Sequence, residues 1–156
     1  MDFAVVSTDT IVRMKKAAAI TLATERLIDK NIAAHCELLN SMPGIATVFS
    51  CEGHLTAADG LPRRPYIMMA CTRQGLPALE ALMKEFISDP IYAACHCEVT
   101  LHELPWVESS MGWAYDPNEY YYSWIVRGDS SDNHQVMNQI REHWLESIKK
   151  TIKQFS

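Results

Sequence analysis

The amino-acid sequence predicts a single α+β domain over residues 1–156, with a mixed or antiparallel sheet and amphipathic helices packed on it. Segments with apolar residues at helical spacing are interspersed with segments that are β-branched or alternate apolar with polar residues. Their order is helix, strand, strand, helix, strand, strand, helix, and strands that follow one another directly favour antiparallel or mixed pairing. The length of 156 residues, 48% of them hydrophobic, suits one such domain.

The N-terminal third is predicted to be helical. Residues 8–10 are Thr-Asp-Thr, which are favourable helix-capping types, and an alanine-rich helix is expected over residues 11–26. A second helical segment is expected over residues 29–40, and the two segments could also form one long helix. Pro43 and Gly44 end this region, because both residue types interrupt helices.

Two further amphipathic helices are predicted later in the chain. One begins near Pro77, which is tolerated in the first turn of a helix. Its buried stripe is expected to consist of Leu79, Leu82, Met83 and Phe86. The other follows a turn over residues 129–133, and its apolar residues recur every four positions: Val136, Ile140, Trp144, Ile148 and Ile152. We expect both stripes to pack on the sheet.

Four strands are predicted, over residues 45–50, 66–71, 91–101 and 119–127. The third strand alternates most regularly, and one of its faces carries Ile91, Ala93, Cys95, Cys97, Val99 and Leu101. Alternation of this length predicts a sheet with one buried face, so we expect the helices to cover one side only.

The composition disfavours several classes of protein. The net charge of −5 offers no overall basic face, so binding to long nucleic acids is not expected. No apolar run approaches the ~20 residues of a membrane span, so no membrane partner is expected. The five cysteines are odd in number and no secretory signal precedes them, which indicates reduced thiols and a cytoplasmic location.

Common cofactor and catalytic motifs are missing from the sequence. It contains neither G-x-G-x-x-G nor G-x-x-x-x-G-K-[ST], so no Rossmann-type site or P-loop is expected. It contains no G-x-S-x-G elbow and no H-E-x-x-H pattern, which disfavours α/β-hydrolases and zincins. A functional site must therefore be sought among residues outside these motifs.

The strongest candidate site is the turn Ser50-Cys51-Glu52-Gly53-His54, at the end of the first strand. Gly53 permits a backbone conformation or a close approach that other residues would not. Backbone N–H groups at such a turn can bind an anion. Cys51, Glu52 and His54 are the candidate catalytic residues, because they offer a thiol, a carboxylate and an imidazole that titrates near neutral pH.

Other interpretations of these residues stay open. The turn could be an ordinary tight loop with a buried Cys51, or Cys51 and His54 could form a thiolate–imidazolium dyad. Cys51, His54 and Cys71 could also hold a metal, but no zinc-type spacing is present and no metal site is our expectation. Cys95 and Cys97 share a strand face with apolar residues, so we expect small core residues rather than ligands. Three histidines are expected on helix surfaces: His35, His134 and His143.

Aromatic residues are concentrated between residues 106 and 124. Trp106 and Trp113 lie in an expected loop over residues 105–117, which could close over a site as a lid. In the following strand, Tyr120, Tyr122 and Trp124 would share one face. Such a cluster could stack on a nucleobase, form a protein interface or pack in the core.

Several short motifs occur together between residues 28 and 101. They are Ile28-Asp29-Lys30, Leu38-Leu39-Asn40-Ser41, Thr47, Ser50-Cys51-x-Gly53 and Pro65-Tyr66-Ile67-Met68. In this combination the sequence resembles the tRNA wybutosine-synthesizing protein 3 family. The resemblance implies that Ser50, Cys51 and Gly53 line a pocket for S-adenosylmethionine, which that family uses to methylate a tRNA base. Glu52 and His54 stand where the family has serine and arginine. The Ser-Cys-x-Gly-His pattern is also similar to that of small bacterial and phage proteins.

We therefore expect a small-ligand-binding protein with a pocket at this turn, taking a nucleotide or adenosyl compound. Arginines suit anionic groups, which favours Arg63 and Arg64 as ligand contacts. The full set of predicted ligand-binding residues is Ser50, Gly53, Arg63, Arg64, Tyr66 and Trp113. One alternative is an S-adenosylmethionine-dependent methyltransferase-like enzyme that acts on a nucleoside or RNA. Another is a non-catalytic interaction or inhibitor protein that forms a homo-oligomer through its aromatic residues.

Overall fold

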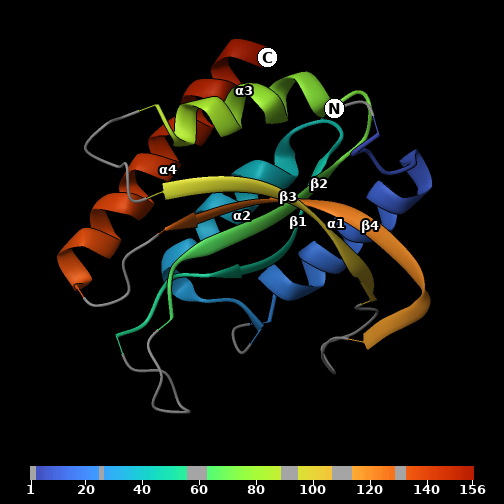
Figure 1. The fold of residues 1–156 in the computed structure, drawn as a ribbon, viewed down its shortest axis with the longest axis horizontal. Coiled ribbons are helices and arrows are strands. Elements are labelled where there is room, and N and C mark those ends of the chain that lie inside the picture. Colours follow the sequence, from blue (N-terminus) through green and yellow to red (C-terminus); the bar gives the residue numbers. More distant parts are fainter. Residues whose placement is uncertain (1–2, 25–26, 56–62, 89–94, 107–113, 129–132) are drawn as a thin grey trace.

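The structure is a computed structural model that describes residues 3–24, 27–55, 63–88, 95–106, 114–128 and 133–156. Its elements are α1 (Thr8–Leu22), η2 (Lys30–Ile32), α2 (Ala33–Ser41), β1 (Ile45–Cys51), β2 (Tyr66–Cys71), α3 (Leu76–Phe86), β3 (Cys95–Trp106), β4 (Ala114–Gly128) and α4 (His134–Phe155). The strands form one antiparallel sheet in the order β1-β2-β4-β3, with the helices around it (Figure 1). The predicted single α+β domain is confirmed, with antiparallel pairing.

Helices cover both faces of the sheet, so the expectation of one covered face was wrong. On one face, α2, α3 and α4 pack over a large hydrophobic core. On the other face, α1 places Ile11 and Met14 in a smaller cluster with Ala46 and Val48 of β1. The reason lies in β1, where Ile45 points to the large core while Ala46 and Val48 point to the small one, so that both faces of the strand are apolar.

The two later amphipathic helices pack as predicted. The α3 stripe is buried at Leu79, Leu82, Met83 and Phe86. The α4 stripe is buried at Ile140, Trp144 and Ile148, with Val136 and Ile152 partly buried against the same core. The rings of Phe86 and Trp144 meet edge to face, with 6.0 Å between their centroids. This contact joins α3 to α4, which lie side by side on one side of the sheet (Figure 1).

In the described part of the N-terminal region, α1 and α2 are separate α-helices, with the short η2 directly before α2, rather than one long helix. The first begins after Ser7, whose hydroxyl oxygen accepts a hydrogen bond of 3.1 Å from the Thr10 backbone N–H. It ends at Leu22, earlier than the predicted residue 26. Thr21 and Thr24 donate their hydroxyls to carbonyls one turn earlier, an arrangement that slightly destabilises a helix.

The strands β3 and β4 form a long hairpin. The expected loop over residues 105–117 is shorter than predicted, because residues 105–106 continue β3 and residues 114–117 begin β4. Pro105 is tolerated there because β3 is an edge strand and a register irregularity lies between Glu103 and Pro105. Residues 107–113 and 91–94 lie outside the described part of the chain.

The alternation predicted for the third strand holds for only part of its length. Cys95 is buried and Cys97 packs partly against the large core, which confirms that both are core residues. Leu101 is 54% exposed, because the hairpin extends beyond the helices that cover its base (Figure 1). Leu104, from the opposite face of the strand, is buried in the smaller cluster instead.

One of the helix histidines is not at the surface. His134 is exposed and His143 is half-buried, but His35 is only 4% exposed, so its predicted surface position was wrong. The His35 Nε2 atom donates to the Arg141 carbonyl at 2.7 Å. The burial arises because α2 packs between the sheet and α4.

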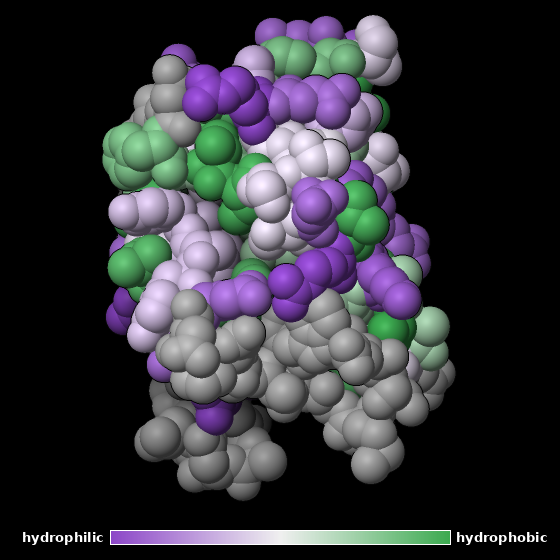
Figure 2. All heavy atoms as spheres, turned by 90° about the vertical axis from the view of Figure 1, so that its right-hand side faces the viewer, coloured by the Kyte–Doolittle hydropathy of each residue, from purple (hydrophilic) through white to green (hydrophobic). Residues whose placement is uncertain are grey.

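The exposed large hydrophobic side chains belong to several different elements. They are Phe3, Val12, Ile87, Leu101, Tyr120 and Phe155. On the face drawn in Figure 2, hydrophobic residues (green) are interspersed with hydrophilic ones (purple). Among the described helices, none combines the length and the apolar character that crossing a membrane requires.

Candidate functional site

The Ser50–His54 turn leaves the end of β1 and closes against the segment that leads into β2. Gly53 has a positive φ of 89°, and a Cβ atom there would meet Met137 Sδ at 2.7 Å and Pro65 Cδ at 3.0 Å. His54 and Arg63 then exchange two backbone hydrogen bonds, each 2.8 Å long. Glycine is therefore required by both the backbone conformation and the space, and the turn is fixed beside Arg63.

Asp29 organises the turn from a distant part of the chain. It lies just before η2, and its Oδ2 atom accepts a 3.1 Å hydrogen bond from the Glu52 backbone N–H. The same oxygen lies 3.3 Å from His54 Nε2. Sequence reasoning placed residue 29 only at the start of a helix and missed this role, since nothing local signals a contact across such a separation.

The Cys51 thiol lies beside Asp29 and His54. One donor atom from each of these three residues lies within 4.8 Å of the other two. Cys51 is 7% exposed, and its Sγ atom accepts a hydrogen bond of 3.4 Å from the Gly53 N–H. Burial raises the pKa of Cys51 above its ordinary value, and the Asp29 carboxylate raises it further. A free thiolate is thus disfavoured at neutral pH, unlike in a low-pKa catalytic cysteine.

The Glu52 side chain bonds to Asn31 rather than to the thiol or the imidazole. Its Oε2 atom accepts a 2.6 Å hydrogen bond from Asn31 Nδ2. Its backbone carbonyl accepts a hydrogen bond from Arg141 Nη1 of α4. Arg141 is itself buried and also donates to Asn138 Oδ1. Arg141 was not predicted as a site residue, because the sequence pattern of α4 showed only its hydrophobic stripe.

Ser50 lines a different space from Cys51. Its Oγ atom accepts a hydrogen bond from the Cys36 thiol, with 3.5 Å between the two atoms. Both residues line a cavity of about 40 Å³ between β1 and the α1–α2 region, whose described lining includes neither His54 nor Arg63. This volume is far below the roughly 300 Å³ of small-molecule pockets.

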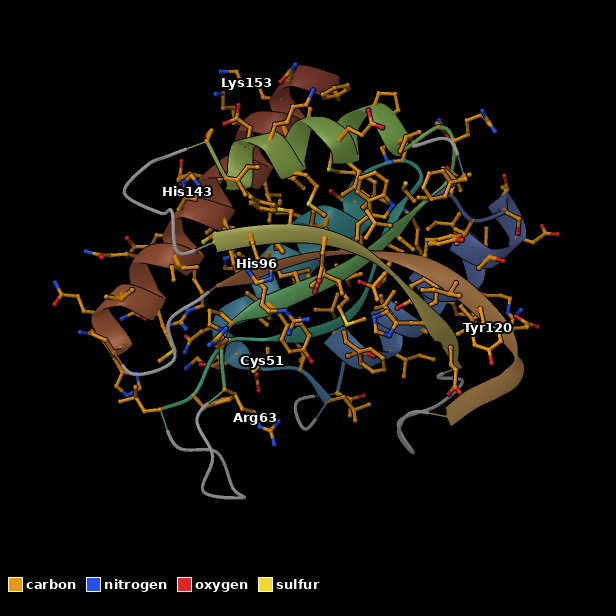
Figure 3. The ribbon with its side chains drawn as sticks, viewed as in Figure 1. Cys51, Arg63, His96, Tyr120, His143 and Lys153 are labelled. Atoms are coloured by element: carbon orange, nitrogen blue, oxygen red, sulfur yellow. The ribbon has the colours of Figure 1, made fainter. Side chains whose placement is uncertain are left out.

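Three arginines gather near the start of β2. Arg63 and Arg64 are exposed, and Cys51 and Arg63 lie at the same end of the β1–β2 pair (Figure 3). Tyr66 pairs with Cys51 on one side and Arg127 on the other, and the Arg127 guanidinium lies 5.6 Å from the centre of its ring. Burial raises the pKa of the Tyr66 phenol, and the neighbouring Cys51 adds to this. Arg127 was not among the predicted site residues.

The remaining predicted residues do not join this cluster. Cys71 pairs with Ile45 at the other end of β2, so the alternative metal set of Cys51, His54 and Cys71 was wrong. Cys71 lies five positions along the strand from Tyr66, which corresponds to about 16 Å. Burial raises the pKa of Cys71 to about 12, as expected for an inert core thiol. Trp113 lies outside the described residues, as does the side chain of Trp106.

Fold and site together define an α+β protein with a thiol, an imidazole and a carboxylate clustered at one end of its sheet. The chain matches no protein-family model, and neither the curated proteins nor the solved structures include a significant match to it. The resemblance to the wybutosine-synthesizing protein 3 family therefore stays a prediction that these comparisons do not test.

Proposed function

We propose that this protein binds a small anionic ligand of the nucleotide or adenosyl class where the Ser50–His54 turn meets the Arg63–Tyr66 segment. The observation that carries the proposal is the pair of backbone hydrogen bonds between His54 and Arg63. These bonds bring Arg63, and with it the adjacent exposed Arg64, beside a turn that is closely packed at Gly53.

The local charge supports an anionic ligand. Arg63 and Arg64 precede β2 in the sequence and Arg127 lies over the Tyr66 ring at its start, although the whole chain has a net charge of −5. Arg127 is paired with Glu98 at 3.2 Å, so the proposal relies on Arg63 and Arg64. Of the acids beside the turn, Asp29 accepts from the Glu52 N–H and Glu52 accepts from Asn31. Guanidinium groups bind phosphate through paired, charge-assisted hydrogen bonds, and a compact cluster suits a small ligand better than a long nucleic acid.

Binding is proposed in preference to covalent thiol catalysis because of the state of Cys51. Its pKa is raised by burial, whereas a cysteine nucleophile needs a lowered one. The Glu52 carboxylate, a candidate acid or base, bonds to Asn31. The His54 imidazole lies within 4.8 Å of the Cys51 thiol, but burial and the Asp29 carboxylate both disfavour the thiolate that catalysis would need.

The proposal is tested by thermal shift with a panel of compounds at millimolar concentration. The panel contains mono-, di- and triphosphates of the common nucleosides, cyclic nucleotides, S-adenosylmethionine and inorganic phosphate. A bound ligand raises the melting temperature by mass action. We expect at least one nucleotide or adenosyl compound to stabilise the protein and the Arg63→Ser, Arg64→Ser double variant to lose that stabilisation.

The matched control is Arg73→Ser. Arg73 is an exposed arginine two residues beyond the other end of β2, far from the turn, so its loss should leave the stabilisation intact. If no compound stabilises the protein, or if the double variant responds as the wild type does, the proposal is wrong. Stabilisation by inorganic phosphate equal to that by nucleotides would show recognition of the anion without the base.

A further inference from the structure

Three different metal-binding atoms meet beside the turn, and they come from three positions in the sequence. Asp29 precedes η2, Cys51 ends β1, and His54 is the last residue of the turn. One ligand atom from each lies within 4.8 Å of the other two. Within this set, His54 Nε2 and Asp29 Oδ2 are 3.3 Å apart.

We propose that Asp29, Cys51 and His54 form a binding site for a zinc-type transition-metal ion. A thiolate, an imidazole and a carboxylate are all established zinc ligands, and the thiolate disfavours Mg²⁺ and Ca²⁺, which prefer oxygen. The inference goes beyond the proposed function, because it rests on these three side chains and not on the arginines.

The separation of the His54 and Asp29 ligand atoms matches tetrahedral coordination, and the Cys51 Sγ lies within 4.8 Å of both. With metal–nitrogen and metal–oxygen bonds of about 2.0–2.1 Å, two tetrahedral ligands lie about 3.4 Å apart. The His54 Nε2 and Asp29 Oδ2 atoms are separated by 3.3 Å. Three protein ligands leave a fourth position for water or a ligand oxygen, the pattern of open zinc sites.

Neighbouring backbone groups hold two of the ligands in place. The Glu52 N–H donates to Asp29 Oδ2 at 3.1 Å, and the Gly53 N–H donates to Cys51 Sγ at 3.4 Å. Arg141 fixes the same turn from α4 through the Glu52 carbonyl. Hydrogen bonds of this kind orient metal ligands before the ion arrives and are a regular part of such sites.

The site is open on one side. The Asp29 and His54 side chains are 33% and 35% exposed, whereas Cys51 is 7% exposed. An ion would therefore approach past the carboxylate and imidazole and meet the thiol below them. Binding displaces the thiol proton, so that the thiolate and the carboxylate together balance the charge of a divalent ion.

The test is a titration of Co²⁺, a spectroscopic substitute for zinc, into the reduced, chelator-treated full chain. We expect a thiolate-to-cobalt charge-transfer band that saturates at about one ion per chain and disappears when Zn²⁺ is added. Cys51→Ser should abolish the band. His54→Gln and Asp29→Asn should each weaken cobalt affinity by about tenfold or more.

Two control variants address the other cysteines and histidines. Cys97→Ser should keep the band, because Cys97 lies on β3 and donates to the Met83 carbonyl of α3. His134→Gln should keep the affinity, because His134 is exposed at the start of α4. Loss of the band in Cys97→Ser, its survival in Cys51→Ser, or no uptake of Co²⁺ by the folded wild type would each overturn the proposal.

Circular dichroism shows whether each variant is folded. If Cys51→Ser is unfolded, the half-exposed His54→Gln decides the question, and unchanged cobalt affinity in that variant overturns the proposal. Nucleotide binding is measured separately on metal-free protein with Cys51 intact. The metal site and the anion site can therefore fail independently.

Discussion

The carboxylate of Asp29 lies 3.3 Å from the imidazole of His54, although 25 residues separate them in the sequence. The contact depends on α1 ending at Leu22, since a continuous helix from residue 11 to residue 40 would carry residue 29 in its middle. The non-helical backbone at Asp29 instead places its side chain beneath the turn that follows β1.

Replacing Arg141 should destabilise the turn together with the fold. In Arg141→Met, the Glu52 carbonyl loses its charged donor and Asn138 loses a partner. Hydrogen bonds to charged groups contribute about 1.5–3 kcal/mol each, so with two bonds lost we expect urea unfolding to show a decrease of at least about 1.5–3 kcal/mol. Asn138→Ala removes only the second bond and should cost less. An Arg141→Met protein as stable as the wild type would show that the Glu52 contact contributes little.

Gly53→Ala should be more destabilising than Gly128→Ala. At Gly53 a Cβ atom meets Met137 Sδ at 2.7 Å on a backbone with φ of 89°. At Gly128 it meets Pro65 Cγ at 2.8 Å, but without a positive φ. Strained conformations of this kind cost about 1–3 kcal/mol in addition to the steric clash. Urea unfolding compares the two variants, and equal losses would mean that the clash alone matters.

The free energy of unfolding should fall as the pH drops below about 6.5, because of His35. Burial lowers the pKa of this histidine in the folded protein, and the charge of Arg141 lowers it further. Below pH 6.5 the unfolded chain binds a proton at His35 that the folded chain does not, so acid favours unfolding. The loss approaches about 1.4 kcal/mol per pH unit until the folded-state pKa is reached.

This pH dependence is measured by urea unfolding at pH 7.5 and pH 5.5. His35→Gln should reduce the difference in free energy of unfolding between the two pH values, because the titrating group is gone. His134→Gln, at the exposed start of α4, should leave that difference unchanged. A wild-type protein equally stable at both pH values would contradict the proposed effect of the buried His35.

Trp144 should tolerate phenylalanine better than alanine. The side chain is fully buried and packs edge to face on Phe86, so Trp144→Ala should cost about 3–5 kcal/mol. The indole Nε1 is buried without a hydrogen-bond partner among the described residues. Trp144→Phe removes that unsatisfied N–H and keeps an aromatic ring, so we expect a smaller loss by thermal unfolding. Equal losses would show that the volume of the indole dominates.

Most of the secondary structure could be predicted because its signals are local. The four-residue repeat of α4 and the β-branched run of β1 show the buried side directly in the sequence. The hairpin loop was predicted too long, since Pro105 resembles a turn residue unless the edge position of β3 is known. The second covered face was missed because the four consecutive residues 45–48, all buried, fit either a one-sided or a two-sided strand.

The candidate site was only half visible in the sequence. Cys51, Gly53 and His54 are adjacent, so a turn of mixed chemistry could be recognised. Asp29 and Arg141 come from remote segments, and their roles follow from tertiary packing that a single sequence does not encode locally. Ser50, although next to Cys51, faces the small cavity near Cys36, because neighbouring strand residues project to different sides.

The uneven pairing of β4 has a consequence for which part of the sheet unfolds locally. Residues Trp124–Arg127 pair with β2 and β3 at once, whereas the described residues of β4 nearer the hairpin tip are paired with β3. In hydrogen exchange, amides near the tip should therefore exchange through local fraying, and those near Arg127 only through global unfolding. Tyr66 and Cys51 lie at the doubly paired end. The candidate site is thus expected to stay folded while the hydrogen bonds near the hairpin tip open and close locally.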